Sequence, residues 1–225
     1  MVTYGHDMSH VTTRTEPRTV LVGGMFDPPH NGHVAMVAAA TIPGDEVQII
    51  VSGVPPHRPQ PIAPIRDRLD LAAAAFTEHP SLVGRRVVIS DIESRDAHEV
   101  SYTIDTVRQI ASHSMPGRPV LVIGDEHAAT IETWHSWQEL LEIVDLAVVT
   151  RHGSVVAGTS QGARLESLAQ ARGSVIWWCP MPPVATSSTG IRARVEAGDM
   201  RAVESSVPEQ VMPLLSGIYG MIRHG

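Results

Sequence analysis

Two histidines three residues apart, His30 and His33, follow a glycine pair and a proline pair in the segment 23–33. They open a predicted helix, so both side chains should lie on one face near its N-terminus. That end of a helix carries partial positive charge and free amides, which suit a phosphate. Gly23 and Gly24 let the backbone approach a ligand closely. The segment therefore predicts a phosphate site, where two imidazoles donate hydrogen bonds to a phosphoryl oxygen and stabilise developing charge.

A second candidate anion site lies near the end of the chain, in the segment 186–192. Ser187, Ser188 or Thr189 can cap the helix that follows and expose its first amides to an anion. Arg192 lies one turn into that helix, so its guanidinium can reach the same anion. The alternative interpretations are an ordinary helix cap beside a solvated arginine, and two histidines that begin a surface helix by chance. The order of strand, glycine loop and proline turn before the histidines favours the phosphate site there. The segment 186–192 taken alone favours an ordinary helix cap, and only the presence of the histidine segment favours the anion site at Arg192.

These segments resemble signature motifs of the nucleotidylyltransferase superfamily. His30-Asn31-Gly32-His33 matches its His-x-Gly-His signature, and the Gly-Gly-x-Phe-Asp-Pro-x-His opening looks like bacterial nicotinate mononucleotide adenylyltransferases. Three further segments resemble that family's second-strand loop, nicotinate-side loop and aromatic platform, namely 54–59, 101–103 and 133–134. The segment 186–192 resembles its C-terminal Ile-Ser-Ser-Thr-x-Ile-Arg motif. The matches follow one another in the family's order and cover nearly the whole chain.

The resemblance implies a transferase that moves a nucleoside monophosphate from a triphosphate onto an anionic acceptor and releases pyrophosphate. It assigns the reacting phosphates to His30 and His33, and the leaving pyrophosphate to Arg192 with His57 and Arg58. Mg²⁺ is expected with the triphosphate, bound mostly by phosphate and water, and no metal site on the protein is predicted. The nucleotide-binding residues expected on this basis are Gly23, Gly24, Met25, Phe26, His57, Arg58, Gly124, Glu126, Ser187, Ser188 and Thr189.

The acceptor is expected to bind residues from other parts of the chain. Those predicted are Tyr102, Thr103, Asp125, Trp134, His135 and Arg151. The family stacks a pyridine ring on a tryptophan at the position of Trp134, whereas core packing is the alternative for this residue. Arg151, just past a predicted strand, is an expected phosphate contact, and Trp137 is expected in the core.

Three departures from the family pattern fall on the acceptor side. Met25 stands where the family has serine or threonine, and Glu126, beside Asp125, stands where it has aspartate. His135 stands where relatives often carry an aromatic residue. Transfer from ATP to nicotinate mononucleotide is therefore the first prediction. A specialised paralogue that uses another phosphate or phosphonate acceptor, with CTP as an alternative donor, is the second, and a catalytically dead nucleotide sensor is the third. A dinucleotide-binding oxidoreductase is disfavoured, because no Gly-x-Gly-x-x-Gly follows the first predicted strand.

Strands and helices that must position these residues alternate along the chain. Short apolar runs predict strands at 19–22, 47–51, 86–92, 119–123, 146–150 and 175–178. Composition and period predict helices at 34–41, 65–79, 102–113, 164–172, 189–197 and 208–216, with a broken helical region around Trp134 and Trp137. This order is typical of an α/β fold with a doubly wound parallel sheet and a helical C-terminal extension. The resemblance implies that the sheet is of the Rossmann-like nucleotidylyltransferase type. We expect residues 1–17 to form a flexible N-terminal tail and residues 18–225 to form a single domain.

Composition sets further limits on function. The 225 residues are 43% hydrophobic and 18% charged, which provides enough apolar material for a core. Arginine supplies all 17 basic side chains against 24 acidic ones, and the net charge of −7 disfavours nonspecific binding of nucleic acid. The single cysteine, Cys179, excludes a disulfide scaffold, and no apolar run reaches the roughly 18 residues of a membrane span. We expect a cytoplasmic enzyme with small-molecule substrates, no nucleic-acid partner and no membrane partner; homo-oligomerisation is left open.

Overall fold

The computed structural model describes residues 14–53, 60–94, 101–112, 117–150 and 157–220 of the chain. Within these ranges six parallel strands form one sheet, and each predicted strand is confirmed to within two residues at either end. The strands are β1 Thr19–Gly24, β2 Glu46–Val51, β3 Arg86–Ser90, β4 Val120–Gly124, β5 Asp145–Thr150 and β6 Ile176–Pro180. Their order across the sheet is β3-β2-β1-β4-β5-β6, which confirms the predicted doubly wound α/β fold.

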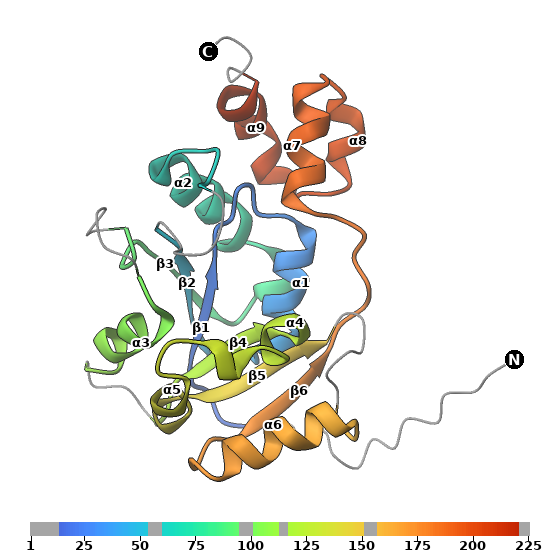
Figure 1. The fold of residues 1–225 in the computed structure, drawn as a ribbon. Helices are drawn as coiled ribbons and strands as arrows, with labels where there is room; N and C mark the ends of the chain where they lie inside the picture. Colours follow the sequence, from blue (N-terminus) through green and yellow to red (C-terminus); the bar gives the residue numbers. More distant parts are fainter. Residues whose placement is uncertain (1–13, 54–59, 95–100, 113–116, 151–156, 221–225) are drawn as a thin grey trace, which may run out of the picture.

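Helices connect the strands and cover both faces of the sheet (Figure 1). They are α1 Asn31–Ala40, α2 Ile65–Phe76, α3 Thr103–Ala111, α4 Asp125–Ala128, α5 Trp137–Ile143, α6 Ser160–Gln170, α7 Ser188–Glu196, α8 Met200–Glu204 and α9 Met212–Tyr219, with 3₁₀ turns η2 Pro80–Leu82, η3 Ile131–Thr133 and η4 Glu209–Val211. The longer helices agree with the prediction, and the broken helical region consists of η3 and α5. The sequence did not indicate α4 and α8, because helices of four and five residues are too short to show an apolar period. No helix in the described parts of the chain is both long enough and apolar enough to cross a membrane.

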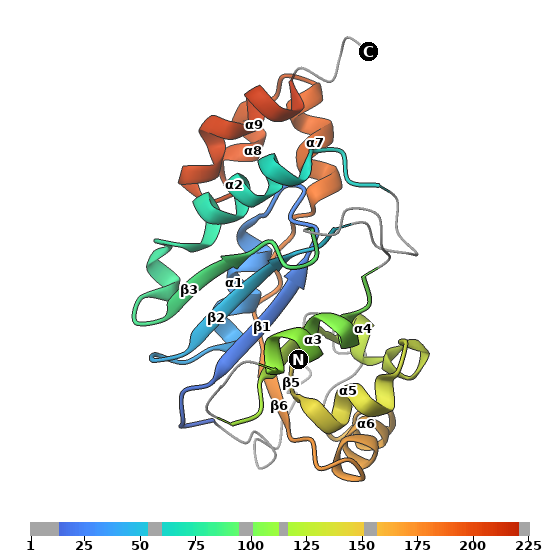
Figure 2. The ribbon, with the colours of Figure 1, turned by 90° about the vertical axis from the view of Figure 1, so that its left-hand side faces the viewer.

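Alternate residues of each strand point to opposite faces of the sheet, and they form two apolar layers. One layer contains Val20 and Val22 of β1 and packs against α1, α2 and the C-terminal helices α7 to α9. The other contains Leu21 of β1 and Ile123 of β4 and packs against α3, α5 and α6. Figure 2 shows this division, with α2 and α7 to α9 gathered at one end of the molecule and α3 to α6 at the other.

The topology of the sheet marks the place where a ligand is expected. The strand β1 lies in the middle of the sheet, between β2 and β4. The chain winds from β1 through β2 to β3 at one edge, and then starts again at β4 toward β6 at the other. In open parallel sheets, ligands bind beyond the carboxyl ends of the strands at such a reversal of strand order. The segments that follow β1 and β4 border this position.

The described end of the predicted N-terminal tail is attached to the sheet. Arg14 donates two hydrogen bonds, of 2.7 and 2.5 Å, to the carboxylate of Asp45, which is completely buried. The amides of Arg18 and Ile42 donate to the same carboxylate, so this buried charge is well compensated. Residues 1–13 lie outside the described residues.

Candidate active site

The two histidines predicted to contact phosphate lie together at the start of α1. Their rings stack, with centroids 3.7 Å apart and an angle of 22° between the ring planes. The backbone N–H of His30 donates to Nδ1 of His33 over 3.2 Å. Because Nδ1 accepts this bond, a neutral His33 ring carries its proton on Nε2, which can then donate to a phosphate oxygen. His30 is only 4% exposed and His33 is half-buried, so His33 is the more accessible of the two imidazoles.

Phe26 packs against the histidine pair and is buried in the core. Its ring makes edge contacts with His33 and Phe76, with ring centroids 5.3 Å apart in each case, and the residue is 1% exposed. Its φ of 48° is a left-handed conformation that is unfavourable for a residue with a bulky side chain, and burial of the ring stabilises it. The sequence predicted Phe26 as a nucleotide-binding residue. The structure places its side chain in the core, and nucleotide binding by Phe26 stays a prediction.

Glycines leave the room that these rings require. A Cβ on Gly32 would lie 3.0 Å from the ring of His30, and a Cβ on Gly24 would lie 2.8 Å from the ring of Phe26. Gly23 differs, because a Cβ there would meet no atom within 4 Å. The space over Gly23 is therefore open, as the predicted close approach of a nucleotide to the backbone requires.

We expect Gly23→Ala to fold normally and to bind ATP at least about tenfold more weakly, a loss of about 1.4 kcal/mol. The added methyl group meets no protein atom, but it fills the space where the nucleotide is predicted to lie. Isothermal titration measures the affinity, and a thermal melt checks the fold. Gly217→Ala is the matched control, because a Cβ at that exposed position on α9 also meets nothing within 4 Å. Unchanged ATP affinity in Gly23→Ala would contradict the placement of the nucleotide.

Hydrogen bonds within the protein already use several amides at the start of α1. The N–H of Asn31 donates to the carbonyl of Ser206, and the N–H of His33 donates to the carbonyl of His30. The N–H of His30 is bound by the ring of His33, as described above. The prediction that this helix end offers free amides to a phosphate is therefore wrong for these three residues. The imidazoles of His30 and His33 stay the predicted phosphate donors at this position.

Asp27 was not predicted as a site residue, yet it connects four parts of the structure. Its carboxylate accepts hydrogen bonds from the amides of Ile62 and Ala63, at 2.7 and 3.1 Å, and from the hydroxyl of Tyr219 at 2.7 Å. Its carbonyl accepts a hydrogen bond from the guanidinium of Arg192. Asp27 thus joins the histidine segment to the residues before α2, to α7 and to α9. The signal in the sequence was its place inside the Gly-Gly-x-Phe-Asp-Pro motif.

Arg68 of α2 fixes the segments that follow β1 and β2. It is 3% exposed and donates hydrogen bonds to the carbonyls of Met25, Ser52 and Ala63. Burial lowers the pKa of Arg68, and the nearby charge of Asp27 opposes this decrease, so the guanidinium stays protonated. The sequence did not indicate this role, because one arginine in a helix carries no sign that its side chain points inward.

The N-terminus of α7 lies against the histidine segment. Ser187 caps the helix by accepting a hydrogen bond from the N–H of Gly190 at 3.2 Å, which selects one of the three predicted caps. Ser188 instead donates to the carbonyl of Pro28 at 2.8 Å. The hydroxyl of Ser188 therefore attaches α7 to the loop after β1, which brings the two predicted anion sites side by side.

Arg192 lies between these two sites. Its Nη1 donates to the carbonyl of Asp27, and its Nη2 donates to the hydroxyl of Thr189 at 3.3 Å. The side chain is 20% exposed, and Nη1 lies 3.7 Å from the carboxylate of Asp27. The guanidinium is thus oriented by the loop that leads to His30, while part of it stays accessible to an anion.

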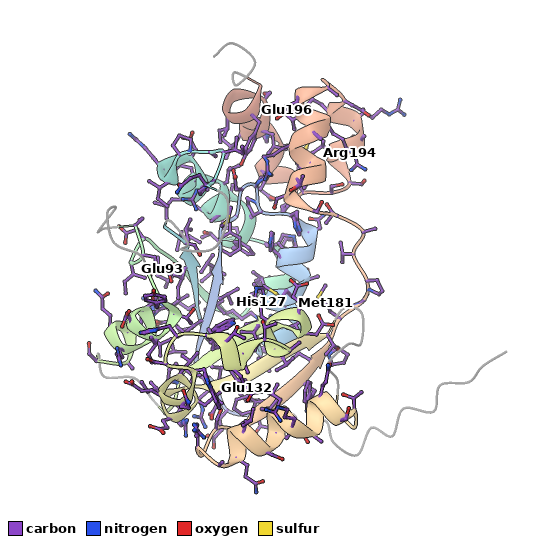
Figure 3. The ribbon with its side chains drawn as sticks, in the orientation of Figure 1. Glu93, His127, Glu132, Met181, Arg194 and Glu196 are labelled. Atoms are coloured by element: carbon purple, nitrogen blue, oxygen red, sulfur yellow. The ribbon has the colours of Figure 1, made fainter. Side chains whose placement is uncertain are left out.

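Most of the predicted acceptor residues lie across the reversal point, on the segments around α3 and α4. Tyr102, the N-cap of α3, lies against His135 with ring centroids 4.4 Å apart. Trp134 is half-buried and makes an edge contact with His127 of α4 at 6.0 Å. Tyr102 and Trp134 both pack against the core layer beneath them, so each ring is held on one side and partly exposed on another. His127, labelled in Figure 3, was not predicted.

The acidic pair after β4 lies at the start of α4, with Gly124 as the N-cap. Asp125 is 4% exposed and accepts a hydrogen bond from the N–H of Glu126 at 3.2 Å. The side chain of Glu126 is exposed, and its carboxylate lies 4.0 Å from Nδ1 of His127. Thr103 is the first residue of α3. Of the two acids, Glu126 is therefore the one that a bound ligand can meet directly.

Glu93, just beyond β3, links the end of β2 to α3 (Figure 3). Its carboxylate accepts a hydrogen bond from the hydroxyl of Thr106 at 2.9 Å, and further bonds from the hydroxyl of Ser52 and the amide of Gly53. Burial raises the pKa of Glu93, and these hydrogen bonds oppose the rise. The network holds the start of α3, and with it Tyr102, near the segment after β2. The sequence analysis missed Glu93, although an acid directly after a predicted strand was an available signal.

Replacing Glu93 with glutamine should change how stability depends on pH. Because the native pKa of Glu93 is raised above its ordinary value of 4.5, the native state binds more protons at this group than the unfolded state does. The stability contributed by Glu93 is therefore fully present below the ordinary pKa of 4.5, and it is lost as pH rises through the native pKa. Glutamine does not titrate, so the free energy of unfolding of Glu93→Gln minus that of the wild type should increase with pH.

Urea unfolding at several pH values between about 4 and about 7 measures this difference. The exposed Glu78 supplies the control, since Glu78→Gln also removes one carboxylate. A difference between Glu93→Gln and the wild type that stays constant with pH, or falls as pH rises, would overturn the role of burial at Glu93.

Three predicted site residues, His57, Arg58 and Arg151, lie outside the described residues. Among the residues that the structure does describe, no group of three or more His, Cys, Asp and Glu side chains is arranged to hold a metal ion. Burial raises the pKa of the Cys179 thiol to about 11, so this thiol stays protonated and is a poor nucleophile.

Comparison with known proteins identifies relatives along most of the chain. The Cytidylyltransferase-like family model matches residues 21–194. A probable nicotinate-nucleotide adenylyltransferase of Methylibium petroleiphilum is 36% identical over 200 residues, which cover 86% of this chain and 85% of that protein. A protein of the same description from Albidiferax ferrireducens is 33% identical over 184 residues, which cover 80% of this chain and 86% of that protein.

Solved structures of a more distant protein share the fold. Plasmodium falciparum nicotinic acid mononucleotide adenylyltransferase complexed with NaAD superimposes with a TM-score of 0.71 at 12% identity, covering 90% of this chain and 96% of that one. The same protein complexed with APC gives a TM-score of 0.65, covering 88% and 94% of the two chains. The range matched by the family model includes the stacked histidines that follow β1. The chain belongs to the cytidylyltransferase-like family and, within it, to the nicotinate-nucleotide adenylyltransferases, which are nucleotidyl-transferring enzymes.

Proposed function

We propose that this enzyme transfers the adenylyl group of ATP to nicotinate mononucleotide in NAD biosynthesis. The observation that carries the proposal is the stacked pair His30 and His33 at the reversal point of the sheet, with Arg192 held against the same loop by the carbonyl of Asp27. Three side chains that we expect to bind phosphate therefore meet at the loop after β1. Gly23, at the end of this strand, leaves open space over its backbone. The relatives described as nicotinate-nucleotide adenylyltransferases and the structural neighbour complexed with NaAD support adenylyl transfer to this acceptor.

The reaction requires positioning and charge stabilisation from the protein, and no covalent intermediate. A phosphate oxygen of nicotinate mononucleotide attacks the α-phosphorus of ATP in line. The bond to the bridging oxygen breaks, and its electron pair leaves with pyrophosphate. His33 donates from Nε2 to an oxygen of the reacting phosphate, and His30 supports it through the ring stack. Arg192 stabilises the negative charge that develops on the leaving pyrophosphate.

The divalent ion that the triphosphate needs, for which Mg²⁺ is our proposal, would be carried by ATP. The buried acid beside Arg192, Asp27, is a poor ligand for this ion, because its two carboxylate oxygens already accept three hydrogen bonds. Phosphate oxygens and water supply a full octahedral set for this ion in many nucleotide-binding enzymes. The ion would neutralise phosphate charge, while His33 and Arg192 orient the phosphates.

The acceptor side fits a flat ring but departs from the family pattern. Tyr102 and Trp134 present partly exposed aromatic rings near His127 and His135, and such surfaces suit stacking with a pyridine. The thioether of Met25 cannot donate a hydrogen bond to the acceptor phosphate, as a serine or threonine would. A missing hydrogen bond to a charged group lowers affinity by about ten- to a hundredfold. Such a loss would weaken the binding of nicotinate mononucleotide without excluding it as the acceptor.

Steady-state release of pyrophosphate with ATP, CTP, GTP and UTP, each combined with a panel of acceptors, tests the proposal. The panel contains nicotinate mononucleotide, nicotinamide mononucleotide and simple phosphates and phosphonates. We expect the highest kcat/KM with ATP and nicotinate mononucleotide, above about 10⁴ M⁻¹s⁻¹. The double variant His30→Ala/His33→Ala serves as the blank for contaminating activity. Efficient turnover of another pair, with a far lower value for this one, would replace the substrate assignment.

A further inference from the structure

Tyr219, the last residue of α9, reaches the active-site loop from the far end of the chain. Its hydroxyl donates to Oδ1 of Asp27 at 2.7 Å, and the residue is 1% exposed. We propose that Tyr219 is a positioning residue for the transfer reaction, which fixes the carboxylate of Asp27 and thereby keeps the guanidinium of Arg192 directed at the triphosphate. The proposal rests on the proposed function, because it assumes that Arg192 binds the triphosphate.

The geometry around Asp27 explains why a neutral donor matters there. The amides of Ile62 and Ala63 hold the carboxylate from one direction, and the hydroxyl of Tyr219 holds it from α9. The guanidinium of Arg192 lies 3.7 Å from Oδ2 of the carboxylate, too far for a hydrogen bond, and bonds to the backbone carbonyl of Asp27 instead. Asp27 therefore orients Arg192 through its carbonyl without forming a close, fully paired salt bridge.

Loss of the Tyr219 hydroxyl would change the hydrogen bonding of Asp27 and the position of Arg192. Oδ1 of Asp27 would lose the shorter of its two hydrogen bonds and keep only the amide of Ala63. A buried carboxylate that has lost a donor draws the nearest cation toward itself. Arg192 is the partly exposed cation at this position, whereas Arg68 is tied to three backbone carbonyls. Arg192 would then close the remaining distance to the carboxylate and withdraw from the triphosphate.

Tyr219 is a donor that does not titrate under working conditions. Burial, the hydrogen bond to Asp27 and the charge of Asp27 all raise its pKa, while the charges of Arg192 and Arg68 oppose the rise. The phenol therefore keeps its proton at neutral and moderately alkaline pH. The packing supports the same role, since α9 lies beside α7, which carries Arg192, and both belong to the C-terminal group of helices (Figures 1 and 2).

Tyr219→Phe tests the proposal, because it keeps the buried ring and removes only the hydroxyl. We expect KM for ATP to rise about tenfold, the lower end of the effect of one hydrogen bond to a charged group. KM for nicotinate mononucleotide should stay within about twofold of the wild type. Titration of ATP alone should show the same loss of affinity, which gives a readout independent of the acceptor. Unchanged affinity and KM for ATP in the folded variant would overturn the proposal.

Leu215→Ala is the matched structural control. Leu215 lies on the same helix and is completely buried, but its apolar side chain cannot donate a hydrogen bond to Asp27. Its removal should lower the melting temperature more than Tyr219→Phe does, yet leave KM for ATP near the wild-type value at 25 °C. If activity merely followed the stability of α9, Leu215→Ala would show the larger kinetic defect, and the positioning role would be wrong.

A double-mutant cycle with Asp27→Asn adds a test that does not depend on folding alone. If Tyr219 acts through Asp27, then Tyr219→Phe should have little further effect on KM for ATP once Asp27 is asparagine. Fully additive effects would contradict that route. The outcome is separable from the substrate assignment. A wild type inactive with ATP and nicotinate mononucleotide overturns the proposed function, whereas an active wild type matched by Tyr219→Phe overturns only the role of Tyr219.

Discussion

Replacing His33 with alanine is expected to lower kcat by about 10²- to 10³-fold, the loss typical of removing one preorganised donor to a developing negative charge. The structure gives the physical reason. Nδ1 of His33 is bound by the N–H of His30, so the proton of the neutral ring sits on Nε2, directed away from that contact. Alanine removes this donor and leaves the helix itself intact, because α1 is held by packing of its apolar side chains.

The variant His30→Ala should also lose activity by about 10²-fold, since the ring of His30 stacks directly on His33. It should be less stable than His33→Ala, because His30 is the more buried of the two. Single-turnover kinetics with saturating ATP and nicotinate mononucleotide separate the chemical step from binding, and circular dichroism checks the fold. His79→Ala is the control, as His79 lies beyond the C-terminal end of α2, where its ring accepts a hydrogen bond from the N–H of Ser81. Near-normal turnover in both His30→Ala and His33→Ala would remove the histidines from the mechanism.

The second large effect is expected for Arg192→Lys, which should lower kcat/KM for ATP by about 10²-fold although the charge is kept. The guanidinium uses two of its nitrogens at once, on the carbonyl of Asp27 and the hydroxyl of Thr189, and still has donors for a phosphate. An ammonium group is a point charge that cannot reproduce this planar fork. Lysine would therefore lose both its orientation and its contact with the leaving pyrophosphate.

Binding measurements distinguish this assignment from a general loss of function. ATP affinity should fall in Arg192→Lys, while affinity for nicotinate mononucleotide stays near the wild-type value. Arg194→Lys is a matched control, because Arg194 is exposed on the same helix (Figure 3) and should tolerate the change. A defect confined to the acceptor would show that Arg192 belongs to the other half of the site.

On the acceptor side of the site, only some of the features could be predicted from the sequence. The positions of Tyr102 and Trp134 could be predicted from the resemblance, and both side chains are partly exposed beside histidines. Which of the two neighbouring acids faces a ligand could not be read from the sequence. The answer depended on the short helix α4, whose start buries Asp125 and exposes Glu126. Adjacent residues in a helix point in different directions, so a shift of the start of α4 by one residue would change which of the two acids is exposed.

Several residues that organise the site have no local signature. Arg68 is buried and Glu93 is half-buried. The partners of these two charged groups are backbone groups and hydroxyls from other segments. Tyr219 lies 192 residues after its partner Asp27. Such contacts depend on where helices pack, and packing positions are set by the whole core and not by a residue's neighbours in the chain. The prediction of free amides at the start of α1 was wrong for the same reason. The N–H of Asn31 donates a hydrogen bond to the loop after α8.

The sequence by itself determined the order of the candidate functional motifs along the chain. A glycine loop and a histidine pair follow the first strand, and a capped helix with Arg192 lies near the end. The sequence could do so because strands, helix starts and phosphate loops each need particular residue types at short, fixed spacing. The tertiary structure decided which groups meet. It brought Arg192 and Tyr219 to Asp27, placed Phe26 under His33, and left open space over Gly23. These relations join segments far apart in sequence, and only the packing of α7 and α9 against the loop after β1 fixes the distances between them.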